Sequence, residues 1–399
     1  MPITLRPHDA PPSFEESTNP RQKVRKAGLS PDYWYAVEYD GNIKPGQVVE
    51  VTFWGHSIAL YRGEDGTLRA MENRCAHRQL KLHRGEVSGC NLVCDYHGWV
   101  YDPEGRVIHM THDLFGRPLP SLRIATYPVK VRYGLIWIFF GDPELAEVRR
   151  IPEIPELEGA NRWACVPVDF TWRAHHSMII DNVSDFTHAY LHRKYKPFDE
   201  AKLTHVEMVG DNVYLSYDTK VGGGRFSGAF VDRKRVNTNQ MDLCFEYPYQ
   251  WSNTDGKIKH WLFILPIDEQ TTRAFFLFYF DALKIPLTDI KIPQRVLTPV
   301  LKIANRLLIK PLLQQDGVAV EAEQEGYLAH HDAPIAEFNP AVHLFQQVII
   351  RKWEEHLAKE RARGDRRYLP VRERAQVADT SPVDASSEAA PPVGQPAGV

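Results

Sequence analysis

The stretch DNVSDFTHAYLH, residues 181–192, is the part of the sequence that is most informative about the fold. If it forms a helix, steps of four, three and four residues bring four side chains to one face: Asp181, Asp185, His188 and His192. Two imidazoles one turn apart can bind one metal ion, and two histidines with one carboxylate form the facial triad of oxygen-activating Fe(II). The alternative interpretation is an amphipathic helix with histidines on its surface.

The composition is that of a globular chain of 399 residues with a formal net charge of −3. This length suits two modest domains with sizeable cores. The near-neutral charge argues against a nucleic-acid partner, because no basic field is present to collect phosphates. No apolar run is long enough to predict a transmembrane segment. Five cysteines without disulfide-framework spacing favour a reducing compartment, so we expect a cytoplasmic protein.

Changes in composition along the chain predict four segments. Residues 1–29 carry prolines and a basic cluster without an apolar core, so we expect a flexible N-terminal arm rather than a secretory signal. Residues 30–150 hold short β-branched and aromatic runs punctuated by glycine, which indicates a small all-β domain. Residues 151–372 mix strand-like and helical patterns, and residues 373–399 have the composition of a disordered tail.

Within these segments several elements are predicted individually. Residues 133–141 read as a buried strand of the first domain. In the second domain, apolar and aromatic patterns predict strands at 212–219, 242–246, 260–266 and 273–281. Helices are predicted at 296–329, interrupted near Pro311, and at 342–360.

A second metal motif lies upstream of the first. Cys75-Ala76-His77 and Cys94-Asp95-Tyr96-His97 are separated by sixteen residues, and each lies between strand-like runs. A Rieske [2Fe–2S] cluster is held by two thiolates on one iron and two imidazoles on the other. Zinc is the alternative, because Cys₂His₂ also suits a tetrahedral ion. Two loops that each offer one Cys and one His favour the cluster over a zinc finger, in which like residues are paired.

With both motifs in this order, the sequence resembles the oxygenase α subunit of the Rieske non-haem iron oxygenases over roughly residues 34–360. The resemblance implies an α+β fold class: an all-β Rieske [2Fe–2S] domain and a catalytic domain of antiparallel sheet with flanking helices, of helix-grip or START-like type. Asp95 stands where the family usually has Pro, and the two histidines are four residues apart where many members have five. The shorter spacing is similar to the carbazole-dioxygenase type, which implies a homotrimer of α subunits alone.

The resemblance also implies the roles of individual residues. The cluster ligands would be Cys75, His77, Cys94 and His97, and the iron ligands would include His188 and His192. Family members carry the third iron ligand on a late helix, which here points to Asp316; the rival carboxylates are Glu321, Glu323, Glu325 and Asp332.

Two further roles concern the surroundings of the iron. In relatives, an Asp at the position of Asp185 bridges a cluster histidine of one subunit and an iron histidine of its neighbour. Asp181 and Asn182 would fix the orientation of the iron-binding rings. His175 and His176 precede the motif, and we expect them either to pack in the core or to support the metal ligands.

The implied activity needs partners. Electrons would come from a separate ferredoxin and/or NAD(P)H-dependent reductase, because the chain has no nucleotide fingerprint; Gly222-Gly223-Gly224 lacks the G-x-G-x-x-G spacing. The mononuclear Fe(II) would take O₂ as co-substrate. We expect a mono- or dioxygenase that hydroxylates or oxidatively dealkylates an apolar small molecule, aromatic or polycyclic. A Rieske-type electron carrier and a lipid-binding module are the alternative functions.

One stretch lies outside these assignments. Lys302, Arg306 and Lys310 recur every four residues along the otherwise apolar residues 296–313. One interpretation is a core-packed helix with a solvated basic stripe. The other is a docking surface, either for an acidic redox partner or for a membrane surface.

Overall fold

The computed structural model describes residues 10–110, 116–160, 162–195, 198–221, 238–281 and 294–364. The predicted tail, 373–399, lies outside the described residues. The chain divides into a large unit that extends to Glu354 and a short one that begins at Glu355. The large unit holds both predicted metal motifs.

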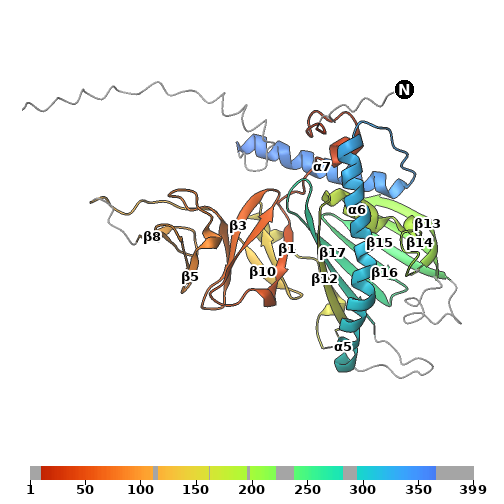
Figure 1. The fold of residues 1–399 in the computed structure, drawn as a ribbon, viewed down its shortest axis with the longest axis horizontal. Coiled ribbons are helices and arrows are strands. Elements are labelled where there is room, and N and C mark those ends of the chain that lie inside the picture. Colours follow the sequence, from red (N-terminus) through yellow and green to blue (C-terminus); the bar gives the residue numbers. More distant parts are fainter. Residues whose placement is uncertain are drawn as a thin grey trace, which may run out of the picture. The chain divides into compact units, whose positions relative to one another are not determined.

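The first half of the chain is an all-β domain of three small antiparallel sheets, drawn in red to yellow in Figure 1. One sheet orders its strands as β1 (Trp34–Tyr39), β11 (Leu135–Phe139) and β10 (Val129–Arg132). The second is β2 (Val48–Phe53), β3 (His56–Arg62), β4 (Leu68–Glu72) and β9 (Thr126–Tyr127). The third is β5 (Glu86–Ser88), β6 (Asn91–Val93), β7 (Val100–Tyr101) and β8 (Val107–His109). Every residue of β11 is buried, which confirms the strand predicted within 133–141.

The second half is built on one antiparallel sheet of seven strands. Its order is β12 (Ala164–Trp172), β18 (Thr272–Phe280), β17 (Ile258–Pro266), β16 (Tyr249–Thr254), β15 (Thr238–Glu246), β14 (Asn212–Val221) and β13 (Phe198–Val209). The four strands predicted here are confirmed as β14, β15, β17 and β18, and so is the fold class. The sequence did not predict β12, β13 or β16. Strand β12 contains Pro167, which a sheet tolerates because β12 is an edge strand.

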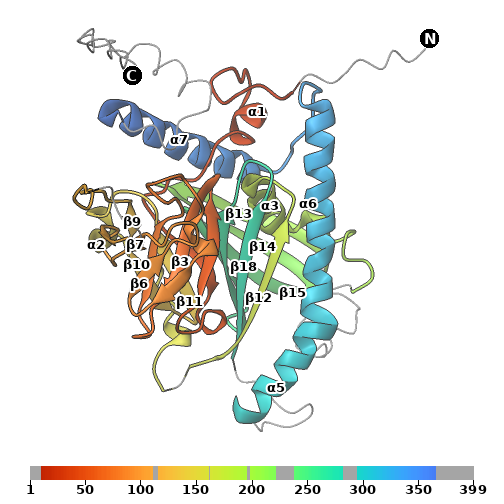
Figure 2. The same cartoon turned by 60° about the vertical axis from the view of Figure 1, so that its left-hand side comes forward.

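Helices complete this architecture. The long ones are α5 (Gln294–Ala304), α6 (Lys310–His330) and α7 (Pro340–Arg363), and the short ones are α1 (Pro20–Val24), α2 (Leu145–Val148) and α3 (His176–Ser184). Short 3₁₀ turns are η1 (Asp40–Asn42), η2 (Leu82–Arg84), η3 (Pro155–Leu157) and η4 (Phe186–His188). Figure 2 shows α5 and α6 continuing one another beside β12. Both predicted long helices are confirmed.

The interruption expected near Pro311 has a different form. A π-helical turn, η5 (Asn305–Ile309), joins α5 to α6. Pro311 lies in the first turn of α6, where proline is tolerated. Apolar residues of this segment are divided between two environments. Leu301 and Ile309 are buried, but Ile303 and Leu307 are exposed, so the segment is not simply packed into the core.

The prediction of one helix over residues 181–192 is wrong. Helix α3 ends at Ser184, and Asp185 has an extended backbone, with φ −101° and ψ 96°. The Asp185 carboxylate accepts a hydrogen bond from the backbone N–H of Thr187 at 2.9 Å. This local bond offers the backbone an alternative to the helix, which is the usual effect of aspartate at such a position. Only the short 3₁₀ turn η4 follows.

The expectation of a flexible arm fails for the described part near residue 20. Val24, Ala27 and Leu29 are fully buried, and Arg25 is 6% exposed. The backbone carbonyl of Ala27 bonds to Nε2 of His176 at 2.8 Å. The basic residues made this segment look solvent-exposed in the sequence, although it also contains a short apolar pattern that is sufficient for burial.

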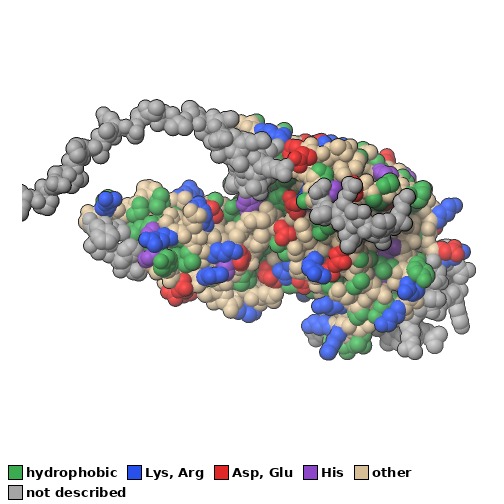
Figure 3. All heavy atoms as spheres, turned by 45° about the horizontal axis from the view of Figure 1, so that its top comes forward, with side chains coloured by type: hydrophobic (Ala, Val, Ile, Leu, Met, Phe, Trp, Pro, Cys, Tyr) green, Lys and Arg blue, Asp and Glu red, His purple; other side chains and the backbone are tan. Residues whose placement is uncertain are grey.

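The surface carries both signs of charge. In the face shown in Figure 3, basic and acidic side chains are interspersed rather than gathered into one large field. In the described residues, no helix is both long enough and apolar enough to cross a membrane.

Candidate metal centres

Three side chains from distant parts of the sequence meet beside the seven-stranded sheet. Nε2 of His192 is 3.3 Å from Oδ1 of Asp316, and Nε2 of His188 is 3.6 Å from the same oxygen. Their possible ligand atoms all lie within 4.8 Å of one another. His188 ends η4, His192 follows it in a turn, and Asp316 comes from the second turn of α6. The two His residues and the carboxylate predicted from sequence are therefore brought together.

Hydrogen bonds fix the orientation of both rings. Nδ1 of His192 donates to Oε1 of Gln315 at 3.1 Å, which leaves Nε2 directed at Asp316. The backbone carbonyl of Asp185 accepts a hydrogen bond from the His188 ring. Such bonds select the tautomer whose other nitrogen is free to bind a metal. Gln315 was not predicted to have this role.

The arrangement fits a divalent metal. Oδ1 of Asp316 is buried and faces Nε2 of both histidines. An acceptor in this position would be costly to bury unless a cation or a proton were shared with the two imidazoles. Two imidazoles and one carboxylate are the donor set of non-haem Fe(II) sites.

The pKa values of the two histidines move in opposite directions. Burial lowers the pKa of His188, and this effect outweighs the negative charge of Asp316. For His192, burial also acts to lower the pKa, but the hydrogen bond and the charge of Asp316 outweigh it and raise the pKa. The carboxylate thus favours a positive charge between the rings, whether a proton or a metal ion supplies it.

The residue after Asp316 explains how closely α6 approaches the sheet. A Cβ atom at Gly317 would lie 2.2 Å from the indole nitrogen of Trp172 on β12. Only glycine permits this approach, so Gly317 sets the distance between Asp316 and the sheet.

The rival carboxylates are engaged elsewhere or lie outside the cluster. Glu321 accepts the backbone N–H of Arg173 at 2.9 Å, and Glu323 forms an ion pair with Arg25. Glu325 and Asp332 are exposed. Of the five candidates, Asp316 is the one that the described structure groups with both histidines.

The second predicted centre lies at two loops of the all-β domain. The ring centroids of His77 and His97 are 4.6 Å apart. Cys75 and Cys94 are each 2% exposed, and their thiols lie within hydrogen-bonding reach of one another. Paired imidazoles and paired thiols are the donor set that a Rieske cluster needs. Burial raises the pKa of the Cys94 thiol, which a bound iron ion would oppose.

Two aromatic residues support these loops. The Tyr101 hydroxyl donates to Sγ of Cys75 at 3.2 Å and accepts the Ala76 backbone N–H at 2.8 Å. Trp99 stacks on the His77 ring with centroids 4.7 Å apart. A glycine beside the first loop permits a close backbone contact, because a Cβ atom at Gly85 would lie 1.9 Å from the Val93 carbonyl oxygen. Gly85 therefore serves the approach of two backbone segments.

The remaining predicted residues have separate positions. Asp185 lies between α3 and η4, partly exposed, where its backbone supports His188. Oδ1 of Asn182 is buried and has no hydrogen-bond partner among the described residues. Asp181 does not contact either iron-site histidine through any described hydrogen bond, so its expected role in orienting those rings is not seen.

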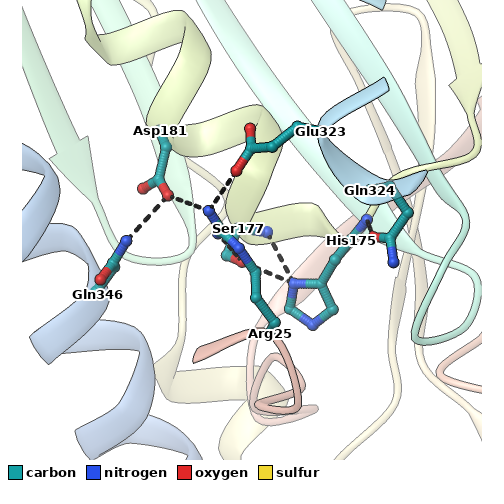
Figure 4. A network of polar contacts seen from close by, with 7 residues as sticks. All are labelled: Arg25, His175, Ser177, Asp181, Glu323, Gln324 and Gln346. Carbon is teal, nitrogen blue, oxygen red and sulfur yellow. Dashed lines mark hydrogen bonds and ion pairs between the residues drawn. The ribbon is translucent and has the colours of Figure 1, made fainter. Parts of the chain in front are cut away.

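Asp181 instead belongs to a buried polar network, shown in Figure 4. Its Oδ2 forms an ion pair with Arg25 at 2.9 Å and accepts a hydrogen bond from Gln346. The same Arg25 nitrogen is 2.9 Å from Glu323 on α6, and its other amino nitrogen donates to Ser177 on α3. Arg25 therefore joins the two elements that lead to the iron-site residues, α3 and α6.

The two histidines before the motif are packing residues, as expected. His175 is fully buried; its ring bonds to Ser177 and its backbone N–H to Gln324. Burial lowers the pKa of both rings, that of His176 to about 3. Burial therefore favours the neutral form of both rings.

Comparisons with known proteins agree with both centres. A family model described as Rieske [2Fe–2S] domain matches residues 33–122, and one described as Vanillate O-demethylase oxygenase C-terminal domain matches residues 172–360. The chain is 46% identical over 338 residues to a 4beta-methylsterol monooxygenase of Methylococcus capsulatus, covering 84% of this chain and 92% of that protein. It is 31% identical over 173 residues to the oxygenase component of dicamba O-demethylase from Stenotrophomonas maltophilia, 42% of this chain and 49% of that one.

Solved structures share the fold. Dicamba monooxygenase bound to 3,6-dichlorosalicylic acid superposes with a TM-score of 0.67 at 21% identity, covering 83% of this chain and 100% of that chain. A mutant of NdmA from Pseudomonas putida with caffeine gives 0.61 at 21% identity, covering 88% and 97%.

Proposed function

Because the chain belongs to the Rieske non-haem iron oxygenases, as a terminal oxygenase component, we propose that it hydroxylates a methyl group on an apolar polycyclic substrate of the sterol class. The observation that supports this most directly is the 46% identity to the 4beta-methylsterol monooxygenase across nearly the whole of both chains. The expected aromatic substrate receives no support from the name of that relative.

The proposed reaction consumes one O₂, two electrons and two protons. One oxygen atom enters a C–H bond to give an alcohol, and the other leaves as water. A separate ferredoxin and/or reductase supplies the electrons. When bound, the cluster would supply one-electron transfer, and the mononuclear iron would supply O₂ activation.

The residues of the chain have distinct parts in this proposal. Cys75, His77, Cys94 and His97 would hold the cluster. His188, His192 and Asp316 would hold the iron from one side and leave its other side open. Gln315 keeps Nε2 of His192 directed at the metal position through the bond to Nδ1. Asn182 has a buried oxygen free to accept a hydrogen bond near this region.

We further propose that a buried amide of the sheet bonds to the oxygen of such a substrate. The His260 ring has a polar neighbour at each nitrogen. Oγ of Ser252 lies 2.6 Å from Nδ1 of His260, and Oε1 of Gln250 lies 3.4 Å from Nε2 of His260. Nε2 of Gln250 is buried without a hydrogen-bond partner in the described chain. Phe276 and Phe278 flank His260, with ring centroids 6.2 and 5.1 Å away. A buried donor without a partner suits a hydroxyl or carbonyl on an otherwise apolar molecule.

Assembly is part of the proposal. Asp185 is partly exposed and one of its oxygens accepts the Thr187 N–H. A carboxylate has further acceptor positions. We expect it to bond to a cluster histidine of a neighbouring subunit in a head-to-tail homotrimer.

The test is turnover with defined substrates. The purified chain, a surrogate ferredoxin and reductase, NAD(P)H and O₂ are incubated with a 4-methylsterol, and products are identified by mass spectrometry. We expect a hydroxylated methyl group, and none with Asp316→Ala.

Oxidative O-demethylation is the second candidate, favoured by the match of residues 172–360 to the Vanillate O-demethylase domain. A methoxylated aromatic acid is therefore the comparison substrate. Formaldehyde from that compound, with no sterol product, would reject the sterol proposal and support this one.

A further inference from the structure

The segment from α5 to the start of α6 presents an unusual surface. One face is buried: Leu301 and Ile309 are 1% and 4% exposed, and both α5 and α6 contact β12. A second face carries an apolar stripe, defined as Val300, Ile303 and Leu307, whose members are 46%, 62% and 63% exposed. Steps of three and four residues keep these side chains on one side of a helix. Single exposed apolar residues are ordinary, but an aligned set on one helix marks a contact surface.

A basic row runs beside the apolar stripe. It consists of Lys302, Arg306 and Lys310, all exposed and four residues apart. Within the described structure none of the three has a carboxylate partner; Lys310 lies 5.7 Å from the centroid of the Phe170 ring. These cations are therefore available to an anionic surface outside the chain.

We infer that this segment rests on an anionic phospholipid surface, with the apolar stripe entering the boundary between headgroups and acyl chains. A helix with one apolar face and adjacent Lys and Arg residues has the composition of interfacial helices. Anionic lipids attract each basic residue near the surface. This inference stands on exposure and charge and does not depend on the substrate class proposed above.

A protein partner fits these observations less well. A specific protein interface buries about 800 Å² on each partner and is enriched in aromatic residues at its centre. The apolar stripe is narrow, entirely aliphatic and confined to one helix. A lipid surface needs no complementary shape, so a narrow stripe with flanking charges is sufficient.

The test is co-sedimentation of the full chain with vesicles. One set contains phosphatidylcholine alone, and the other contains phosphatidylglycerol in addition. We expect binding to the anionic vesicles that weakens as salt is raised, because the charges are exposed. Charge reversal by Lys302→Glu with Arg306→Glu should remove the preference for phosphatidylglycerol. The affinity for the anionic vesicles should fall at least about tenfold.

A second variant tests the apolar stripe. Ile303→Asp with Leu307→Asp should reduce binding to both vesicle types, whereas Val148→Asp, at a residue 72% exposed on α2, should not. Circular dichroism and urea unfolding check that each variant is folded. Wild-type protein that stays in the supernatant with anionic vesicles overturns the inference. A stripe variant that binds normally overturns it too. So does a stripe variant that changes the oligomeric state by ultracentrifugation, since the stripe would then be a subunit contact.

Discussion

Among single residues, Asp316 contributes most directly to the proposed iron site, because it supplies the carboxylate that faces both iron-site histidines. Asp316→Ala should leave two imidazoles, too few to retain the mononuclear iron, and should abolish turnover. The cluster, held by a different domain, should be unchanged. Iron stoichiometry beside the visible spectrum measures both effects. Glu321→Ala is the matched control on the same helix and should retain the iron. If Glu321→Ala loses the iron and Asp316→Ala retains it, Glu321 is the iron ligand instead of Asp316.

Tyr101 is expected to tune the cluster rather than to hold it. Its hydroxyl donates to the sulfur of Cys75, and such a bond favours the more electron-rich reduced state. Tyr101→Phe should lower the reduction potential and leave the iron content unchanged, as measured by a redox titration followed by EPR. Tyr61→Phe removes a hydroxyl that bonds to the Cys90 carbonyl instead and serves as the control. An unaltered potential in Tyr101→Phe would show that the bond has no such effect.

At this scale the sequence was informative where chemistry requires a residue type at a fixed spacing. The Cys–His loops and His188 with His192 could be recognised for that reason. Asp316 could be proposed only through the resemblance, because it is separated from the histidines by more than a hundred residues. Gln315 and Tyr101 had no sequence signal, since many side chains can donate or accept one hydrogen bond.

At the scale of elements, helix α3 shows how a local bond overrides a periodic pattern. The spacing of four acidic and histidine side chains predicted one helix over 181–192, but the Asp185 side chain stops it. His188 and His192 still converge, because a 3₁₀ turn and a further turn bring them together. Spacing therefore predicted the two histidines correctly from a wrong secondary structure.

The Arg25 network should govern how firmly α3 and α6 are held together. Arg25→Met leaves Asp181 buried without its ion pair, and we expect a loss of about 3–5 kcal/mol in the free energy of unfolding. Iron affinity should also fall, because Arg25 ties α3 to α6, the helix that carries Asp316. Urea unfolding and metal titration measure these. Lys23→Met is the control, because Lys23 pairs with Glu354 at the surface, where ion pairs contribute about 0–1 kcal/mol. Equal effects of both variants would contradict a special role for Arg25.

The same network predicts a pH dependence. Burial raises the pKa of Asp181 from 3.8 to about 6, against the opposing effect of Arg25. The folded state then holds a proton more tightly than the unfolded one, so the contribution to stability is present below pH 4 and is lost as the pH rises through about 6. Asp181→Asn should remove this dependence, a relative change of about 2 kcal/mol between pH 4 and 7. If the wild-type protein instead gains stability relative to Asp181→Asn as the pH rises, the ion pair with Arg25 determines the pKa of Asp181 more strongly than burial does.

At the scale of the whole molecule, the two centres belong to different domains, and the proposed homotrimer would bring each cluster to a neighbouring iron. Chains with His77→Cys and chains with Asp316→Ala should each be inactive alone. Co-expressed, they should form mixed trimers in which an intact cluster faces an intact iron site, and product formation should recover well above either parent. Asp185→Asn should retain its metals and lose coupled turnover. Mixed trimers that form but remain inactive would place electron transfer within one chain.

The architecture of two domains could be predicted because strands and helices leave periodic patterns and the two motifs occur in order. The N-terminal segment could not. Arg25 lies in a run of basic residues, which on composition alone reads as solvated, and its partners Asp181 and Glu323 are more than a hundred residues away. Burial of a charge is decided by such distant partners.

The π-helical turn η5 also has an evolutionary consequence. A π turn is equivalent to one extra residue in an α-helix, and each residue turns the helix by about 100°. Because the wider turn absorbs the extra residue, α5 and α6 keep the faces that an uninterrupted helix one residue shorter would present. In a continuous α-helix the same insertion would rotate the apolar stripe by about 100° relative to Asp316, so the π turn lets the chain gain a residue while the surface and the metal ligand both keep their directions.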